Sequence, residues 1–308
     1  MIRGLGKRLS ALRAALPDVV SDRRGVVLIA VLWICALIMW FALQISAETR
    51  LQGEDQILSI RKSQALYLAT GGCFEALARM GQPPPLRADE APGLNWQPDG
   101  KPRLVEYHTG RAIVIIEPED RKVNVNKAGQ PQLKQILERA GADEISAERL
   151  TDIIMDFIDQ DDTPRMHGAE DSSYKKSGHG FGPFNGELSS LDQLLLVPGV
   201  TQQLFYGYGR EGGRKAHDVP EVYNEFVIPG KYSLFSLLTV YGSNANPSRG
   251  FQDEETDPRP VSWAPNGVYR ILSFGMSANG PPSVGVCLIV RFSPLERGAY
   301  KVLSRKIL

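Results

Sequence analysis

The hydrophobic pattern of the chain begins with one unbroken apolar run near the N-terminus. The run extends from Val26 to Leu43, VVLIAVLWICALIMWFAL, and contains no charged or strongly polar side chain. At ~1.5 Å per residue, a helix of this length approaches the ~30 Å apolar thickness of a bilayer. Helices in soluble cores are rarely apolar on every face. The sequence therefore predicts a membrane-spanning helix over residues 26–45.

The helical pattern continues past this run but changes in character. Proline is absent from Val26 until Pro83, so one helix is predicted over residues 26–80. An ordinary cleaved secretory signal has a shorter apolar region and a small-residue cleavage site, and it fits this pattern poorly. The second half of the helix is amphipathic, with apolar side chains near one face at helical spacing: Ile57, Ile60, Tyr67, Phe74 and Leu77.

Short β-like runs follow a loop that is rich in proline and glycine. The segment 81–120 begins with this loop and then contains two predicted strands around the tight turn Thr109-Gly110. The segment 243–308 begins with a polar loop and contains three more. The predicted strands are Leu104–His108, Arg111–Glu117, Val268–Phe274, Ser283–Phe292 and Ala299–Ile307.

The residues between the two groups of strands, 121–242, have a helical pattern. Four helices are predicted there: Pro131–Arg139, Ala147–Ile158, Leu191–Val197 and Thr201–Tyr206. The apolar stripe of the second consists of Leu150, Ile153, Ile154 and Phe157. The predicted fold class is α+β, in which a long N-terminal α-helix and a small antiparallel β-sheet are interrupted by a large inserted domain that is mainly α-helical.

Charge and cysteine content narrow the class of protein. Of the 308 residues, 35 are Lys or Arg and 35 are Asp or Glu, an ordinary globular composition that excludes a collagen-like or fully disordered chain. The three cysteines, Cys35, Cys73 and Cys287, show neither a disulfide framework nor a metal-binding spacing. Residues 1–25 carry six basic and two acidic side chains. By the positive-inside rule, this end stays in the cytoplasm and the C-terminal part is exported to the periplasm.

The boundary between the basic segment and the apolar run carries a processing motif. Arg23-Arg24-Gly25 followed by Val26 and the apolar run resembles the leader of type IV pilins and pseudopilins. In that family a prepilin peptidase cuts after the glycine, here between Gly25 and Val26, so residues 1–25 are expected to be a leader peptide. Most such subunits have glutamate at the fifth mature position, where this chain has Ala30. That difference resembles the K-type minor pseudopilins (GspK) of type II secretion. The alternative for this segment is an uncleaved signal anchor.

Three further segments resemble the K-type family, in matching order and spacing. The first is Val123–Ala128, VNVNKA, and the second is Asp156–Arg165, DFIDQDDTPR, with Gly168-Ala169-Glu170 just after it. The third is Leu191–Val200, LDQLLLVPGV, followed by Leu238–Tyr241. The resemblance spans about residues 23–292. It departs from the family pattern after Tyr241, where a second Asn-x-Asn-x-Ala segment is not evident.

This resemblance implies a structural and assembly role and no enzymatic activity. A member of the family is a single-pass protein of the bacterial inner membrane with its C-terminal domain in the periplasm. Its implied partners are the I- and J-type minor pseudopilins, the prepilin peptidase and the inner-membrane secretion platform, and it assembles at the pseudopilus tip. Two alternatives remain: a signal-anchored periplasmic hydrolase with its site in the acidic insertion, and a minor pilin of a type IV pilus.

Motifs for catalysis and nucleic-acid binding are weak. The pattern GxGxxG at residues 207–212 follows a predicted helix, whereas dinucleotide binding requires a preceding strand. GxSxG and HExxH are absent, and the four histidines lack metal-ligand spacing. Residues 191–204 resemble half of a helix-hairpin-helix. Residues 143–192, however, contain 12 acidic and 4 basic side chains, which disfavours contact with phosphates, so no nucleic-acid partner is expected.

The acidic run offers one candidate ligand site. Its carboxylates suit Ca²⁺, which takes six to eight oxygen ligands in flexible geometry. An EF-hand loop beginning at Asp159 would need glycine where Pro164 stands, so a calcium loop of another kind is expected. The resemblance supports this expectation, because K-type relatives bind calcium in the inserted domain. The alternative is a solvated acidic loop. The candidate ligands are Asp159, Asp161, Asp162, Glu170 and Asp171.

Overall fold

The structure is a computed structural model that falls into two compact units, Met1–Ser59 and Ile60–Leu308. It describes residues 23–80, 96–176, 181–207, 226, 228–230, 232–242, 266–293 and 299–308. Most of the predicted leader, the predicted loop around residue 250, most of the GxGxxG pattern, and His179 and His217 lie outside the described residues.

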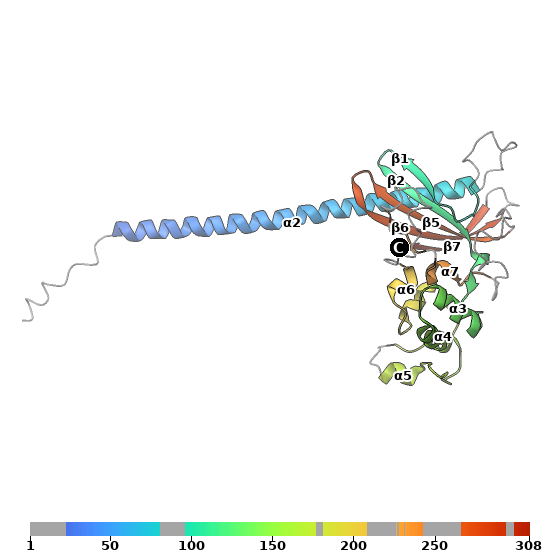
Figure 1. Cartoon of the computed structure of the whole chain (residues 1–308). Coiled ribbons are helices and arrows are strands. Elements are labelled where there is room, and N and C mark those ends of the chain that lie inside the picture. The colour runs from blue at the N-terminus through green and yellow to red at the C-terminus, as the bar shows by residue number, and fades with distance from the viewer. Residues whose placement is uncertain are drawn as a thin grey trace, which may run out of the picture. The chain divides into compact units, whose positions relative to one another are not determined.

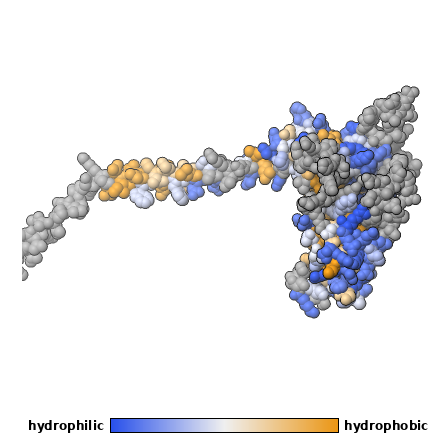
Figure 2. All heavy atoms as spheres, viewed as in Figure 1, coloured by the Kyte–Doolittle hydropathy of each residue, from blue (hydrophilic) through white to orange (hydrophobic). Residues whose placement is uncertain are grey.

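The first unit contains the N-terminal part of helix α2, Arg23–Met80. The segment Val26–Ser46 within it is the one helical stretch, among the described residues, that is long and apolar enough to cross a membrane. Its side chains are exposed, and this part of the helix is predominantly apolar in Figure 2. The predicted single helix is therefore present and begins three residues earlier than expected.

The second unit is built on a five-stranded antiparallel sheet (Figure 1). All five predicted strands are present, several of them longer than the pattern suggested. The strand order is β1-β2-β5-β6-β7, so β2 and β5 lie side by side although the whole insertion separates them in sequence. The strands are β1 (Arg103–Tyr107), β2 (Gly110–Pro118), β5 (Val268–Ser277), β6 (Gly280–Ser293) and β7 (Ala299–Ile307).

One face of this sheet packs against the C-terminal part of α2 through small side chains. Ala69, Cys73 and Ala76 are buried on it, and a Cβ added to Gly275 of β5 would lie 2.1 Å from the carbonyl oxygen of Ala65. The helix therefore lies unusually close to the strands. The predicted apolar face is mostly exposed instead, since of its members in this unit only Leu77 is buried. Small residues occupy the face of the helix that contacts the sheet because they allow this close approach.

The insertion lies between β2 and β5, and its helices gather on one side of the sheet in Figure 1. The predicted helix at residues 191–197 is instead a 3-10 helix. Val197 precedes Pro198 and is extended, so this short helix ends at Leu196. The elements are η1 (Glu119–Arg121), β3 (Val123–Asn124), α3 (Gln130–Arg139), α4 (Glu144–Ile158), α5 (Asp171–Lys176), η2 (Leu191–Leu196), α6 (Gln202–Tyr206), α7 (Leu234–Leu237) and β4 (Leu238–Thr239).

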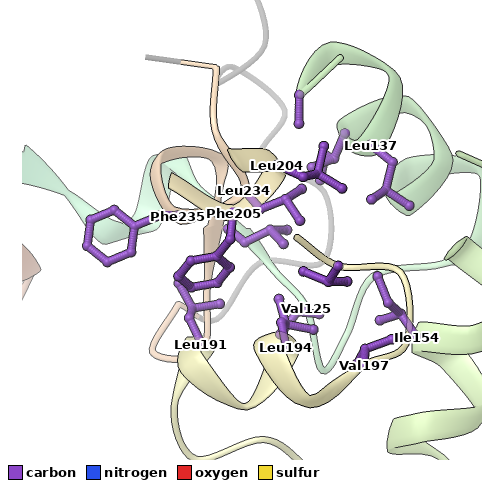
Figure 3. Close-up of a cluster of buried hydrophobic side chains, with 14 of the residues drawn as sticks. Val125, Leu137, Ile154, Leu191, Leu194, Val197, Leu204, Phe205, Leu234 and Phe235 are labelled. Atoms are coloured by element: carbon purple, nitrogen blue, oxygen red, sulfur yellow. The ribbon is translucent and has the colours of Figure 1, made fainter. Parts of the chain in front are cut away.

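A continuous apolar core joins these short helices to the sheet. Figure 3 shows Leu137 of α3, Ile154 of α4, Leu194 of η2 and Phe205 of α6 converging with the residues around them. The predicted stripe of α4 is buried in this core. The same cluster includes residues from β2, β5 and β6, so the insertion covers the sheet face opposite to α2.

The two ends of the insertion are held together beside the sheet. The short strands β3 and β4 pair in parallel, Val123 with Leu238 and Asn124 with Thr239. Next to them the buried guanidinium of Arg270, on β5, lies 2.7 Å from a carboxylate oxygen of the buried Glu119. Since this pair joins β5 to the beginning of the insertion, it fixes where the inserted helices leave the sheet.

Candidate metal site

The site begins at the C-terminal end of α4. The N-cap residue of this helix is Asp143, whose side chain accepts a hydrogen bond of 3.0 Å from the backbone N–H of Ser146. Its last turn carries Asp156, which is fully buried, and Asp159 follows as the C-cap residue. A carboxylate near a helix C-terminus faces the negative end of the helix dipole. The two aspartates therefore need donors or cations from elsewhere in the chain.

The following loop supplies backbone donors to this end of the helix. The N–H of Arg165 donates to Oδ2 of Asp156 at 3.1 Å, and the N–H of His167 donates to Oδ2 of Asp152 at 3.1 Å. A Cβ on Gly168 would lie 1.7 Å from Oδ2 of Asp156, so only glycine fits there. Two buried aspartates, one turn apart on α4, thus hold the loop against the helix.

The loop then brings a third carboxylate to the first two. Ligand oxygens of Asp156, Asp159 and Glu170 all lie within 4.8 Å of one another. Glu170 is only 4% exposed, and neither of its carboxylate oxygens has a hydrogen-bond partner. Its burial, together with the nearby charges of Asp156 and Asp159, raises the pKa of Glu170 to about 7. A buried carboxylate without a donor is costly unless a cation lies beside it.

One basic side chain lies at this cluster. Nη1 of Arg165 is 2.6 Å from Oδ1 of Asp156 and 2.5 Å from Oδ2 of Asp159. These two contacts raise the pKa of Arg165, with the hydrogen bond to Asp159 as the main cause. Three carboxylates and one guanidinium leave an excess of negative charge when all are ionised, which suits a divalent cation.

The structure places the five predicted ligands in different surroundings. Asp159 and Glu170 belong to the convergent group. Asp161 is exposed and accepts a hydrogen bond of 2.8 Å from the N–H of Thr163, and Asp162 is exposed as well. Asp171 forms an ion pair with Lys175 one turn later in α5. The group contains one residue that the prediction did not include, Asp156, although its place one turn before Asp159 could have indicated it.

The donor set of this group fits a hard cation. It consists of carboxylate oxygens, which calcium prefers, and the unpartnered Glu170 is directed into it. Imidazole is not part of the group, since Nδ1 of His167 lies 3.2 Å from Oδ2 of Asp152. The residues that would hold the ion are Asp156, Asp159 and Glu170.

Comparison with known proteins connects this region to one family. Residues 111–207, which include the whole candidate metal site, match a family model described as type II secretion system (T2SS), protein K. Over these residues the chain is similar to the type II secretion system protein K family. The resemblance carried by the VNVNKA, DFIDQDDTPR and LDQLLLVPGV segments is therefore confirmed.

The most similar relatives include several proteins named type II secretion system protein K. The relative from Klebsiella pneumoniae is 27% identical over 198 residues, covering 59% of this chain and 60% of the relative. The one from Pectobacterium carotovorum is 26% identical over 199 residues, 60% of this chain and 61% of the relative. The match to the Dickeya chrysanthemi protein is 36% identical over 72 residues, 23% and 19% of the two chains. The chain thus spans about 60% of the length of the first relative.

A solved structure is also similar. It is a chain of the GspK-GspI-GspJ complex from the type 2 secretion system of enterotoxigenic Escherichia coli, with 17% identity and a TM-score of 0.45. The match covers 85% of this chain and 99% of that chain.

Proposed function

We propose that this protein is a minor pseudopilin of a type II secretion system, inserted in the inner membrane by the first part of α2. The observation that carries the proposal is the family match over residues 111–207, together with one apolar helix at Val26–Ser46. The role is structural: the protein helps to assemble the pseudopilus that exports folded proteins, and it is not an enzyme. The family match gives no support to a hydrolase, and it favours type II secretion over a type IV pilus.

Processing at Gly25 is the direct test of this role. The basic leader is proposed to stay in the cytoplasm, where the prepilin peptidase cuts between Gly25 and Val26, and the second unit is proposed to reach the periplasm. Because the peptidase needs a small residue before the bond, Gly25→Leu should leave a precursor about 2.5–3 kDa heavier than the mature wild-type protein.

The matched control for this test is Gly53→Leu, because a Cβ at Gly53, also in α2, would meet nothing within 4 Å. Mass spectrometry of the membrane-bound protein should find Val26 as the first residue of the wild type and of the control. If the wild type retains residues 1–25, so that it differs from Gly25→Leu only by the mass of the substituted side chain, the protein is not processed as a pseudopilin.

Minor pseudopilins of the I- and J-type are the proposed partners, with the inner-membrane secretion platform beneath them. An exposed apolar stripe on α2 supports helical partners: Ile60, Tyr67 and Phe74 are each more than half exposed and lie seven residues apart. Repeats of this spacing are typical of helices that pack along one another. No nucleic-acid partner is proposed, since the insertion is acidic.

Calcium binding at Asp156, Asp159 and Glu170 is a second part of the proposal. A ligand that binds only the folded state stabilises it by about 2.7 kcal/mol at a hundredfold excess over its Kd. Residues 50–308 should therefore melt at a higher temperature in millimolar calcium than in chelator, and Asp159→Ala should remove most of the difference. Asp171→Asn is the control, because Asp171 pairs with Lys175 outside the group. Identical melting curves for the wild type with and without calcium would contradict calcium binding at this site.

A further inference from the structure

Arg165 lies where two of the proposed metal ligands converge. The ion pairs that the structure shows for Asp156 and Asp159 are both made by the same nitrogen, Nη1 of Arg165, at 2.6 and 2.5 Å. Calcium binds carboxylate oxygens at 2.3–2.6 Å. A metal ion bonded to these same two oxygens would need the volume that the guanidinium nitrogen fills. The guanidinium and a metal ion bonded to these two oxygens therefore exclude one another.

Arg165 leaves part of the cluster unsatisfied. Its side chain reaches the two aspartates, whereas Glu170 remains buried with no hydrogen-bond partner on either oxygen. A single guanidinium balances one of three negative charges. A divalent cation within reach of all three carboxylates would balance two, so the site gains from exchanging one cation for the other.

The surroundings allow this exchange without undoing the loop. The side chain of Arg165 is 32% exposed, so a path to solvent is open to it, while Asp156 stays fully buried. The backbone N–H of Arg165 bonds to Asp156 at 3.1 Å, and its carbonyl oxygen accepts a hydrogen bond of 3.0 Å from the N–H of Gly168. These backbone contacts do not depend on the guanidinium.

We propose that Arg165 is a built-in counter-cation, and that a divalent metal ion binds by displacing its guanidinium from Asp156 and Asp159. This inference rests on the calcium binding proposed above. It assigns two states to the loop between Asp159 and Glu170. In the metal-free state Arg165 neutralises the two aspartates, and in the metal-bound state its side chain is released to solvent. The affinity of the site is then set by competition with a residue of the same chain.

The test measures calcium affinity by titration calorimetry on the full-length protein in detergent after treatment with chelator. Arg165→Gln removes the competing charge and keeps the backbone contacts. Its Kd for calcium should be about tenfold lower than that of the wild type, which corresponds to 1.4 kcal/mol. Its melting temperature in chelator should be lower, because Asp156 and Asp159 lose their counter-cation. Arg165→Lys keeps one positive charge without the planar guanidinium and should bind with intermediate affinity.

Lys134→Gln is the matched control. It removes one positive charge from the same inserted helices, but Lys134 pairs with Glu144 and Glu148, which do not belong to the cluster. A similar gain in affinity from this variant would mean that overall charge, rather than displacement, determines binding, and would overturn the proposal.

The remaining outcomes separate the two proposals. If the wild type binds calcium and Arg165→Gln binds equally or more weakly, Arg165 is not a competitor, although the metal site stands. If Arg165→Gln does not fold, Arg165→Lys provides the same test. Weaker calcium binding by Arg165→Lys than by the wild type would contradict competition. If no variant and no wild type binds calcium, the metal site and the displacement of Arg165 fail together, while processing at Gly25 still tests the pseudopilin role.

Discussion

At the scale of single residues, the insertion contains a buried carboxylate, that of Glu170, whose ionisation is unfavourable. Glu170 has a pKa of about 7 in the folded protein, compared with an ordinary value of 4.5, because burial and two aspartates oppose its ionisation. Between these two values the folded state holds more of the proton than the unfolded state does. The contribution of Glu170 to the stability of the metal-free protein therefore falls as the pH rises through this window.

Glu170→Gln should remove this penalty. In chelator at pH 8 the variant should melt at a higher temperature than the wild type, and the difference should shrink as the pH falls from about 7 towards about 4.5, with a slope of at most about 1.4 kcal/mol per pH unit. Thermal unfolding of residues 50–308 across this range measures it. The exposed Glu187→Gln serves as the control. A difference from wild type that does not change with pH would show that Glu170 ionises normally.

The sequence could indicate only part of this site. The density of carboxylates pointed to Asp159 and Glu170, which the fold brings together. Spacing along the chain could not show that Asp161 and Asp162 face solvent while Asp156 turns inward, since that depends on how the loop folds back onto α4. Nor could it show Arg165 between two aspartates, six and nine residues away in sequence.

At the scale of secondary-structure elements, the sequence pattern predicted which elements exist better than it predicted which face of each element is buried. The short β-like runs predicted all five strands of the sheet, and the absence of proline predicted α2. The apolar stripe of α4 is buried as its spacing indicated. On α2, however, Ile60, Tyr67 and Phe74 of the predicted face are exposed, and the alanine-rich face packs on the sheet. Hydropathy ranks isoleucine and phenylalanine above alanine for burial, but close packing against a strand favours the smaller residue.

Gly275 tests this close packing of helix and sheet. Gly275→Ala should destabilise residues 50–308 by about 1–3 kcal/mol, because the new Cβ would lie 2.1 Å from the carbonyl oxygen of Ala65 and 2.5 Å from the amide nitrogen of Ala69. Gly186→Ala is the control, since its Cβ would meet its nearest neighbours at 3.7 Å or more. Chemical denaturation measures both. Equal midpoints for the two variants would mean that the helix can move away from β5 at no cost.

At the scale of the whole molecule, two features set this chain apart from a subunit of a pseudopilus shaft. The first is Ala30, at the mature position where most pilin-like subunits have the glutamate that neutralises the terminal amine of a neighbour. The second is the insertion, residues 121–242, which lies between β2 and β5. We therefore propose a place at the tip, where neither a partner amine nor a stacking surface is required.

The tip assignment predicts where the protein occurs in an assembled fibre. A buried amine without its carboxylate costs several kcal/mol even after relaxation, so a subunit with Ala30 should be excluded from the shaft, where each amine needs a partner. Immunogold labelling of sheared pseudopili with antibodies against residues 121–242 should mark one end of each fibre, about one subunit per fibre. Antibodies against the major subunit, used on the same grids, should mark the full length. Gold distributed along the shaft by the first antibody would contradict a tip position, because it would show that neither Ala30 nor the insertion prevents incorporation.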